Sequence, residues 1–551
     1  MHAQADMTTP VTIVGGGPVG LCLAMDLASR GIEVDVLELR AAGELPSVKC
    51  NHVSSRTMET FRRLGFVKDV RAAGLPDDYP NDVVFRTRAT GHELTRIPIP
   101  CRTERYTRRG GPDCDWPTPE PPHRINQIFL EPILFRHAAA TAGVRILNRA
   151  QVVGFSQDDA GVTTRYLDLA TGEVREVRSQ FMVGCDGGRS LVRKAIGAKL
   201  VGDEVIQRVQ STYFRAPELL ARITKPDAWM SYLYGAGRQG NLVAIDGRET
   251  WLLHNYLLPH EEGFESVDRD RCLRQLLGVG PEFAYTLLTK EDWIGRRMVA
   301  DRFRDRRVFI SGDASHLWVP YAGYGMNAGI ADAMNLSWQL AAYLAGWAAP
   351  GILQAHERER HPITEQVSRF AMKHAQGAIA ERTTLPDALE DDTPAGAAAR
   401  AAVGRAAYAL NVQQFACAGL NYGYYYDASP LIAYDGEAQP AYTMHDYTPS
   451  TVPGCRVPHF WFGGGRSLYD ALGPGYTLLR FDPALDAAPL VAAALARRVP
   501  LAVLDIADAD RPGVHRHRLL LVRPDQHVAW RGDCLPADPA GLVERLRGAR
   551  E

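Results

Sequence analysis

The sequence of 551 residues predicts an α/β protein, in which a parallel-sheet unit carries an inserted, mixed or antiparallel β-sheet and precedes a small C-terminal α/β unit. Three observations support this class. An apolar strand at residues 11–14 runs into a glycine-rich turn, a helix and a second strand. Alternating apolar and polar runs between residues 208 and 258 are typical of antiparallel strands. Near the C-terminus, helical patterns at 487–498 and 539–546 flank short apolar strands.

The N-terminal turn has the sequence GGGPVG and matches G-x-G-x-x-G. Gly15 permits the tight turn, Gly17 lets backbone N–H groups approach a pyrophosphate, and Gly20 lets helix and strand pack closely. The second strand ends in Glu38, about 20 residues further on, where a carboxylate can accept hydrogen bonds from both ribose hydroxyls of an adenosine. The order of strand, fingerprint, helix, strand and acid predicts a Rossmann-type dinucleotide-binding unit.

A second segment, residues 307–338, predicts another part of a cofactor site. Its apolar strand ends in Gly312 and Asp313, and a loop rich in Pro and Gly leads into a helix that opens at Met326 and Asn327. An acid at a strand end and a glycine-rich loop at a helix N-terminus together suit a polar, partly anionic cofactor.

Composition excludes several other classes. The 62 Lys and Arg residues nearly balance 64 Asp and Glu residues and are spread along the chain, so neither nucleic acid nor a membrane surface is an expected partner. The nine cysteines are scattered and form no C-x-x-C, which argues against a zinc site or a disulfide framework and predicts free thiols. Neither an export signal nor a membrane span is recognisable, so we expect a cytoplasmic protein without a metal.

Three nucleotide-facing motifs follow in one order: GGGPVG at 15–20, CDGGRS at 185–190 and RVFISGDASH at 307–316. In this order the chain resembles the class A flavoprotein aromatic hydroxylases, and RINQ at 124–127 matches the Arg-x-x-Gln of that family. PGCRVPH at 453–459 and RPDQHVAWR at 523–531 resemble the phenol-hydroxylase subgroup, whose C-terminal domain has a thioredoxin-like fold.

This resemblance implies a domain plan. An FAD-binding domain would span residues 1–390, in segments of about 1–80, 120–205 and 290–390, with substrate-binding β-sheet parts inserted at about 81–119 and 206–289. Residues 104–122 predict a long surface excursion, and 384–396 the linker to a thioredoxin-like domain at 396–551. Because that domain lacks C-x-x-C, we expect it to be structural or oligomeric, and it could form a homodimer contact.

The resemblance also implies one noncovalent FAD, reduced by transiently bound NAD(P)H. By the same resemblance, Asp313 binds a ribityl hydroxyl, the amides of residues 325–327 face the flavin ring, and Arg124 and Gln127 contact pyrophosphate and ribityl. Lys49 stands where the family often has Arg. The full set of implied cofactor residues is Gly15, Gly17, Pro18, Val19, Gly20, Glu38, Leu39, Arg40, Lys49, Arg124, Gln127, Asp186, Gly312, Asp313, Pro320, Gly323, Gly325, Met326 and Asn327.

Catalysis of this kind needs a protein group that favours the phenolate form of the substrate. The candidates on the alternating strands are Tyr232, Tyr234, His254 and Tyr256, although a Tyr or His in such a strand is more often a packed wall residue. By resemblance, Pro320 lies near the flavin and the oxygen site. His316 is expected to support the flavin loop rather than to act as a base.

The predicted activity is that of an aromatic monooxygenase, in which a flavin C4a-hydroperoxide formed with O2 hydroxylates an electron-rich ring. A small substituted phenol or hydroxyaromatic is the favoured substrate, with a polycyclic aromatic polyketide as the close alternative. Two other classes remain open at this point: a flavin dehydrogenase that does not activate O2, and a non-catalytic flavoprotein sensor suggested by the additional C-terminal domain.

Overall fold

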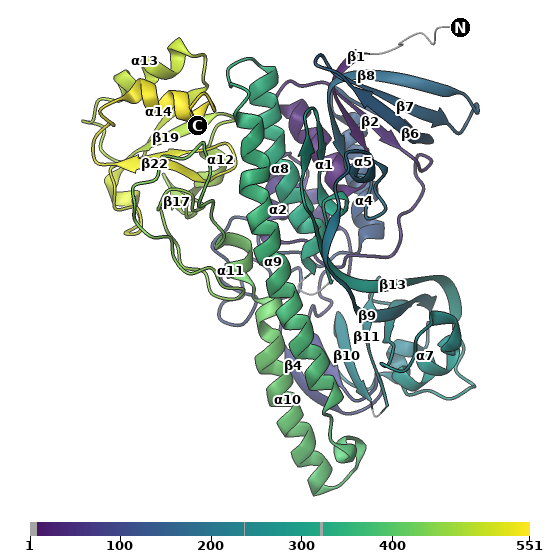
Figure 1. Cartoon of the computed structure of the whole chain (residues 1–551). Helices are drawn as coiled ribbons and strands as arrows, with labels where there is room; N and C mark the ends of the chain where they lie inside the picture. Colours follow the sequence, from purple (N-terminus) through teal and green to yellow (C-terminus); the bar gives the residue numbers. More distant parts are fainter. Residues whose placement is uncertain (1–7, 236, 320–322, 551) are drawn as a thin grey trace.

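The computed structural model describes residues 8–235, 237–319 and 323–550, which fold into three connected parts (Figure 1). A first sheet with its helices lies on one side of the long helix α9 (Ile352–Thr383), and a C-terminal unit lies on the other. A second sheet lies on the same side of α9 as the first, beside the C-terminal half of that helix.

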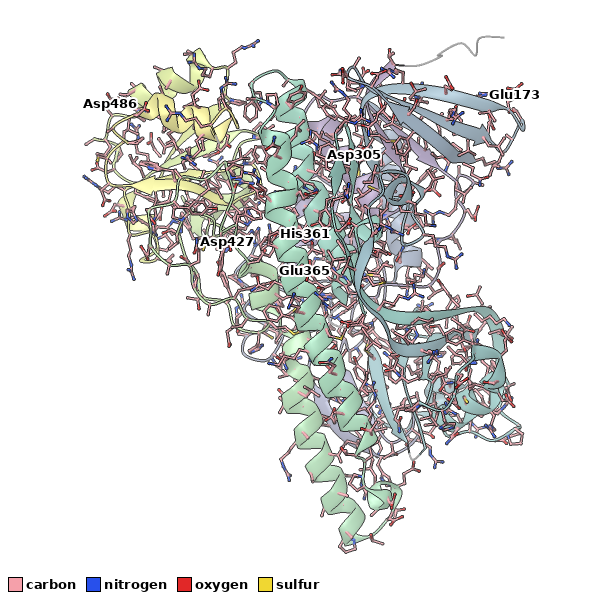
Figure 2. All side chains as sticks on the ribbon, in the orientation of Figure 1. Glu173, Asp305, His361, Glu365, Asp427 and Asp486 are labelled. Atoms are coloured by element: carbon pink, nitrogen blue, oxygen red, sulfur yellow. The ribbon has the colours of Figure 1, made fainter. Side chains whose placement is uncertain are left out.

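The first sheet is parallel through its centre. In spatial order its strands are β14 (Arg304–Asp305), β15 (Val308–Ile310), β8 (Val174–Gly184), β1 (Thr8–Val14), β2 (Val34–Glu38) and β5 (Val144–Asn148). Strand β8 extends beyond the parallel part of the sheet and forms antiparallel pairs with β7 (Val162–Asp168), which in turn pairs with β6 (Ala150–Gln157). Glu173, in the turn between β7 and β8, lies at the outer end of the hairpin that these two strands form, far from His361 and Glu365 on α9 (Figure 2).

Helices cover the first sheet and bury its apolar strands. Val11 and Ile13 of β1 and Val36 of β2 are fully buried and pack in one core with Leu23 and Leu27 of α1 (Pro18–Ser29), as expected for parallel strands covered on both faces. Helix α1 also packs against α8 (Tyr324–Leu344) and α4 (Gln127–Ala140). The shorter helices of this part are α2 (Ser55–Arg63), α3 (Val67–Ala72) and α5 (Leu191–Ala195).

The parallel register brings the three sequence motifs to one edge of the first sheet. Strand β1 pairs in parallel with both β2 and β8, and β8 pairs in parallel with β15. Residues that follow these strands, among them Gly15, Cys185 and Ser311, therefore lie together at the carboxyl ends, where α/β sheets bind ligands. The predicted Rossmann-type fold is confirmed.

The second sheet is mostly antiparallel. In spatial order its strands are β16 (His316–Leu317), β13 (Thr286–Ala300), β9 (Leu200–Arg215), β12 (Thr250–Tyr256), β11 (Arg238–Ala244), β10 (Met230–Gly235), β3 (Val83–Arg86) and β4 (Glu93–Ile97). Strands β9 and β13 pair from Leu200 with Ala300 to Arg215 with Thr286, so this one long ribbon joins the two sheets. Short helices α6 (Leu219–Arg222), η1 (Phe264–Ser266) and α7 (Arg269–Leu277) complete this part.

Residues 104–122 form no helix or strand, as expected, but the expectation of a surface excursion fails for part of this loop. Arg105 and Asp113 are buried and form an ion pair with an N···O distance of 3.0 Å. Thr118 and Glu120 are also buried. Because a buried loop needs internal partners for its polar groups, these residues tie the loop into the protein.

Residues 384–393 connect α9 to α10 (Pro394–Phe415), which returns along α9 and packs against β4 (Figure 1). The connection includes the short helix η4 (Asp387–Glu390). The predicted start of the C-terminal domain at residue 396 therefore falls inside a helix that belongs with the second sheet. Helix α11 (Ala418–Tyr422) follows α10.

The C-terminal unit is built on a sheet with the spatial order β20 (Leu501–Asp505), β19 (Tyr476–Arg480), β21 (Leu519–Val522), β22 (Val528–Gly532). Strands β19 and β20 are parallel and the other pairs are antiparallel, which is the thioredoxin-like arrangement. The remaining elements are β17 (Trp461–Phe462), β18 (Arg466–Ser467), α12 (Leu468–Ala471), α13 (Ala488–Ala496), η5 (Asp508–Asp510) and α14 (Pro539–Leu546). Trp338 of α8 packs edge-on against Tyr476 of β19, so one apolar core continues into this unit.

All nine cysteines are free thiols. Across the described ranges, no helix combines the length and apolar character needed to cross a bilayer. The same ranges contain no cluster of His, Cys, Asp or Glu suited to a metal ion.

Candidate active site

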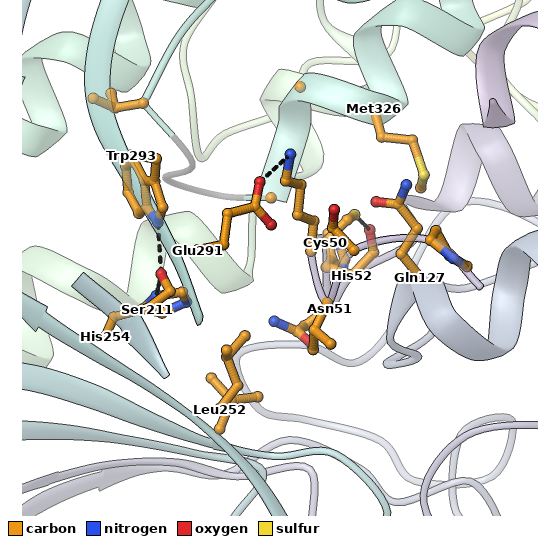
Figure 3. Close-up of a pocket in the computed structure, with 18 of the residues that line it drawn as sticks. Cys50, Asn51, His52, Gln127, Ser211, Leu252, His254, Glu291, Trp293 and Met326 are labelled. Atoms are coloured by element: carbon orange, nitrogen blue, oxygen red, sulfur yellow. Dashed lines mark hydrogen bonds and ion pairs between the residues drawn. The ribbon is translucent and has the colours of Figure 1, made fainter. Parts of the chain in front are cut away.

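A cavity of about 770 Å³ lies between the carboxyl edge of the first sheet and one face of the second (Figure 3). This volume falls within the range of about 300–1,000 Å³ that is usual for ligand pockets. The predicted site residues that line it are Gly17, Pro18, Val19, Arg40, Lys49, Arg124, Gln127, Asp313, Gly323, Gly325, Met326, Tyr232, His254 and Tyr256. The cavity thus joins the predicted cofactor residues to the predicted substrate wall.

The glycine turn packs tightly against the protein at Gly15 and Gly20 and leaves space for a ligand at the start of α1. Gly15 has φ +105°, and a Cβ on it would collide with the carbonyl of Cys185, while a Cβ on Gly20 would overlap the carbonyl oxygen of Gly15. A Cβ on Gly17, by contrast, would meet no protein atom within 4 Å, because Gly17 borders the cavity. No side chain caps α1, so its first amides are available to an anionic group.

Glu38 lies at the end of β2, as predicted, but the protein already uses its carboxylate. It accepts hydrogen bonds from the amides of Gly16 (2.5 Å) and Arg40 (2.9 Å). The Arg40 side chain bridges Glu38 and Glu131. Neither Glu38 nor the exposed Leu39 lines the cavity, so their contact with an adenosine ribose stays a prediction.

Asp313 presents its carboxylate oxygens to the cavity. It lies in η2 (Gly312–Ala314), directly after β15, and its side chain faces the cavity. Among the described residues, none donates a hydrogen bond to it. Desolvation by the surrounding protein raises the pKa of Asp313 above its ordinary value, although the positive charges of the nearby His316 and Lys49 lower it. This geometry fits a group that accepts from a polyol hydroxyl.

The N-terminus of α8 borders the same cavity. Gly323 adopts a left-handed conformation (φ +59°) before the helix, and no side chain caps it. Gly325 and Met326 line the cavity. The Asn327 side chain points elsewhere, accepting from the amide of Ser54 (2.9 Å) and donating to the carbonyl of His52 (3.1 Å). Pro320 lies outside the described residues.

Arg124 lies deep between the two sheets. Its guanidinium pairs with Asp113 (3.1 Å), contacts the His52 ring and stacks over Trp229, whose centroid lies 4.9 Å away. Burial and the neighbouring Arg124 hold the pKa of His52 well below its ordinary value. The sequence missed Asp113, because an acid in an irregular loop carries no spacing signal.

Two further predicted residues serve the protein itself. Asp186 accepts from the hydroxyl of Ser190 (2.5 Å) and from the amide of Leu191 (2.7 Å), which caps α5. It does not line the cavity, although its neighbours Cys185 and Gly187 do, so direct cofactor contact stays a prediction. Gln127 lines the cavity and donates to Glu131.

The second sheet presents a row of polar side chains to the cavity. Tyr232, Asn241, His254, Ser211 and Glu291 stand directly opposite one another on β10, β11, β12, β9 and β13. All of them line the cavity, as residues in register on one face should. The row is bordered, two positions along the strands, by an apolar row of Met230, Val243 and Leu252.

His254 belongs to a hydrogen-bonded group in which Ser211 contacts both His254 and Trp293 (Figure 3). Its Nδ1 lies 2.7 Å from Ser211 Oγ, and the same oxygen accepts a hydrogen bond from Trp293 Nε1 at 2.8 Å. Burial lowers the pKa of His254 to about 4, so its imidazole is neutral at neutral pH. At the end of the row, Lys49 forms an ion pair with Glu291 (2.7 Å) and links the loop after β2 to β13.

The tyrosines differ in position. Tyr232 lines the cavity, stacks on Phe85 and accepts from Gln414 at 3.4 Å. Tyr234 does not line the cavity, because it lies two residues further along β10 and donates to Glu381 of α9 (2.8 Å). The structure therefore does not bring this catalytic candidate to the site.

His316 is buried outside the cavity lining. Its Nε2 pairs with Asp332 (2.8 Å), which also binds Arg360 (2.7 Å). The His316 ring packs on Trp318, a residue of the cavity wall, with centroids 4.5 Å apart. His316 is thus held by Asp332 outside the cavity, and its support of the flavin loop stays a prediction.

Comparison with known proteins decides the family. Residues 8–371 match the family model described as FAD binding domain, and residues 450–549 match that of the aromatic-ring hydroxylase C-terminal domain. The chain belongs to the FAD-dependent aromatic-ring hydroxylases. FAD is its cofactor, and the glycine turn, the α8 N-terminus and the open carboxylate of Asp313 fit that group.

This hydroxylase is similar to proteins whose names refer to different aromatic compounds or biosynthetic pathways. The solved structure of the rebeccamycin biosynthetic enzyme RebC with reduced flavin is 34% identical, with a TM-score of 0.89, and the match covers 98% of this chain and 99% of that one. Aklavinone 12-hydroxylase RdmE of Streptomyces purpurascens is 32% identical over 98% of both chains. Phenol 2-monooxygenase of a Pseudomonas species is 28% identical over 98% of this chain and 92% of the relative.

Proposed function

We propose that this hydroxylase inserts one oxygen atom of O2 into a polycyclic hydroxyaromatic substrate, with NAD(P)H as the reductant. The length of the polar row carries this proposal. Neighbouring strands are about 4.8 Å apart, so the row from Tyr232 to Glu291 extends about 19 Å over four strand intervals. A single phenol ring can contact only adjacent members of such a row, whereas fused rings can lie along it.

The relatives include proteins named for polycyclic natural products and a protein named for phenol, with somewhat higher identity to the first group. RebC and aklavinone 12-hydroxylase, at 34% and 32% identity, carry names of natural products and biosynthetic pathways. The similarity to phenol 2-monooxygenase, at 28% identity, favours the small phenol that the sequence suggested as substrate, and this is the second candidate. The long row shifts our preference to the polycyclic alternative.

The proposed roles of the residues follow from their positions. When bound, FAD supplies the electron transfer and oxygen activation that side chains cannot. The amides beside Gly17 would hold its pyrophosphate, and Asp313 would accept a hydrogen bond from a ribityl hydroxyl. The N-terminus of α8 would stabilise negative charge on the flavin ring by about 0.3–1 kcal/mol.

The substrate side has a different task, which is to exclude water and orient one ring. Met230, Val243 and Leu252 give an apolar surface. His254, next to this surface, is the polar group that we assign to a substrate oxygen. Because the chain has only one G-x-G-x-x-G with its acidic partner, we propose that NAD(P)H binds transiently rather than in a dedicated second nucleotide site.

The test is a substrate panel with the holoenzyme. Phenol, 1-naphthol and 1-hydroxyanthraquinone are compared for stimulated NAD(P)H oxidation, O2 uptake and a product that has gained one oxygen atom by mass spectrometry. We expect kcat/KM to rise with the number of fused rings. A preference for phenol would favour the second candidate, and oxidation of NAD(P)H without a hydroxylated product for any compound would overturn the proposal.

A further inference from the structure

We infer that His254 presents an N–H group, rather than a lone pair, to the substrate, and that Ser211 and Trp293 are the positioning residues that hold it in this tautomer. The inference rests on the proposed function and makes it more specific, because an N–H donor selects a ligand with an oxygen acceptor. The substrate would therefore be bound through a phenolate or a carbonyl oxygen.

The direction of the hydrogen bonds follows from the donors available. An indole nitrogen can only donate, so Trp293 donates to Ser211 Oγ. Ser211 is 5% exposed, and its own hydroxyl hydrogen needs an acceptor inside the protein. Among the described residues, His254 Nδ1, at 2.7 Å, is the acceptor within reach of that hydroxyl.

The opposite tautomer satisfies fewer groups. If Nδ1 carried the hydrogen, both His254 and Trp293 would donate to Ser211 Oγ, and the serine hydrogen would be left without an acceptor among the described residues. That loss is unfavourable in a buried site. A neutral imidazole that accepts at Nδ1 carries its hydrogen on Nε2.

The Nε2 atom is free to meet a ligand. Within the described ranges no residue bonds to it, and His254 lines the cavity. The Trp293 ring packs edge-on against the imidazole, with centroids 5.9 Å apart and planes at 84°, which fixes the ring orientation. Because burial alone lowers the pKa of His254 to about 4, the imidazole stays neutral in the working pH range.

This arrangement changes the expected role of His254. A neutral donor stabilises a phenolate oxygen without accepting its proton, so the proton of a bound phenol leaves to solvent and not to His254. A residue with a pKa of about 4 would in any case be a weak base towards a phenol. In this scheme Ser211 and Trp293 affect the ionisation of the substrate through the ring of His254.

The test measures the ionisation of a bound ligand. The probe is 4-nitro-1-naphthol, whose coloured phenolate is titrated in the presence of the FAD-loaded enzyme. We expect the wild-type protein to lower the apparent pKa of the bound probe by about one unit or more. Ser211→Ala and Trp293→Phe should lose most of this shift, and Ser211→Thr, which keeps a hydroxyl, should retain it.

Two more variants separate a donor from a base. A glutamine amide can donate where Nε2 does, so His254→Gln should keep most of the shift, and His254→Leu should abolish it. Thr212→Val is the matched control, since Thr212 is the next residue of β9 and binds Arg269 on the opposite face. Flavin content and thermal stability are recorded for every variant.

Several results would contradict the inference. An unshifted probe in the wild-type protein, a glutamine variant no better than leucine, or an unchanged shift in Ser211→Ala would each overturn it. Failure of the proposed function would be seen in the formation of hydroxylated product and not in the pKa of the bound probe. An enzyme that shifts the probe as expected but hydroxylates no fused-ring phenol would support this inference and refute the proposed substrate class.

Discussion

Arg523 of the C-terminal unit and Glu359 of α9 form a bidentate ion pair, with N···O distances of 2.6 and 2.8 Å, and both side chains are fully buried. Arg523 also pairs with Asp525 (2.8 Å) and lies over the ring of Trp338. The pair therefore joins the C-terminal unit to the helices that support the FAD site, although no residue of the pair contacts the cavity.

The first prediction is that Arg523→Met strongly destabilises the protein. The substitution leaves Glu359 and Asp525 buried without their cation, and breaking a buried pair in this way costs about 3–5 kcal/mol. Urea unfolding of the holoenzyme measures the loss. Arg480→Met, which breaks the surface pair of Arg480 with Asp505, is the control and should change stability little. Equal effects of the two variants would contradict the assignment of Arg523 as a buried link.

The second prediction concerns two glycines of the same turn. In Gly20→Ala the new Cβ would overlap the carbonyl oxygen of Gly15, so we expect loss of stability even without FAD. In Gly17→Ala the Cβ meets no protein atom and the backbone is extended, so the fold should be retained. Because Gly17 borders the cavity, this alanine should instead weaken FAD binding about tenfold, which is about 1.4 kcal/mol.

Thermal unfolding of the apoproteins and titration with FAD separate these two effects. A stable Gly17→Ala protein with wild-type FAD affinity would show that the pyrophosphate does not lie at this turn.

The third prediction is that Asp313→Ala loses FAD. The carboxylate faces the cavity without a described donor, so its removal deprives a ribityl hydroxyl of an acceptor and disturbs little of the protein. We expect a drop in flavin content with an unchanged circular dichroism spectrum. Asp301→Ala, at a position after β13 outside the cavity, is the control. Normal flavin content in Asp313→Ala would refute the proposed ribityl contact.

The cofactor half of the site was predictable from sequence for a physical reason. Gly15, Gly17 and Asp313 sit at turns after strands, and turn geometry depends on a few local residues. Parallel pairing then brings such turns together at one edge, so local motifs were sufficient to predict their convergence.

The substrate half was not predictable in the same way. Ser211 and Trp293 meet because β9 and β13 pair in one register, and that register depends on contacts between distant residues. The stretch around Trp293, LLTKEDWIGRRM, shows no clear alternation, so β13 itself was missed. Tyr234 was predicted as a site residue but lies outside the cavity. Strand periodicity places it on the same face as Tyr232 but does not show where along β10 the cavity ends.

The fourth prediction is that stability falls as pH decreases from about 6.5 to about 4. Burial lowers the pKa to about 4 for the histidines His254, His356, His374, His459, His515 and His527. In this pH window the unfolded chain binds protons that the folded protein excludes. The free energy of unfolding therefore rises with pH, by up to about 1.4 kcal/mol per pH unit for each such group.

One variant tests this origin of the pH dependence. His515 is buried between the rings of Phe460 and Phe481, with centroids 4.9 and 5.5 Å away, so His515→Phe fits an apolar site and removes one titrating group. We expect its melting temperature to fall less steeply between pH 6.5 and 4.5 than that of the wild-type protein. His260→Phe, at an exposed position, is the control and should leave the slope unchanged. A wild-type melting temperature that is constant from pH 7 to 5 would contradict the prediction, because it would mean that these histidines bind protons equally in the folded and unfolded states.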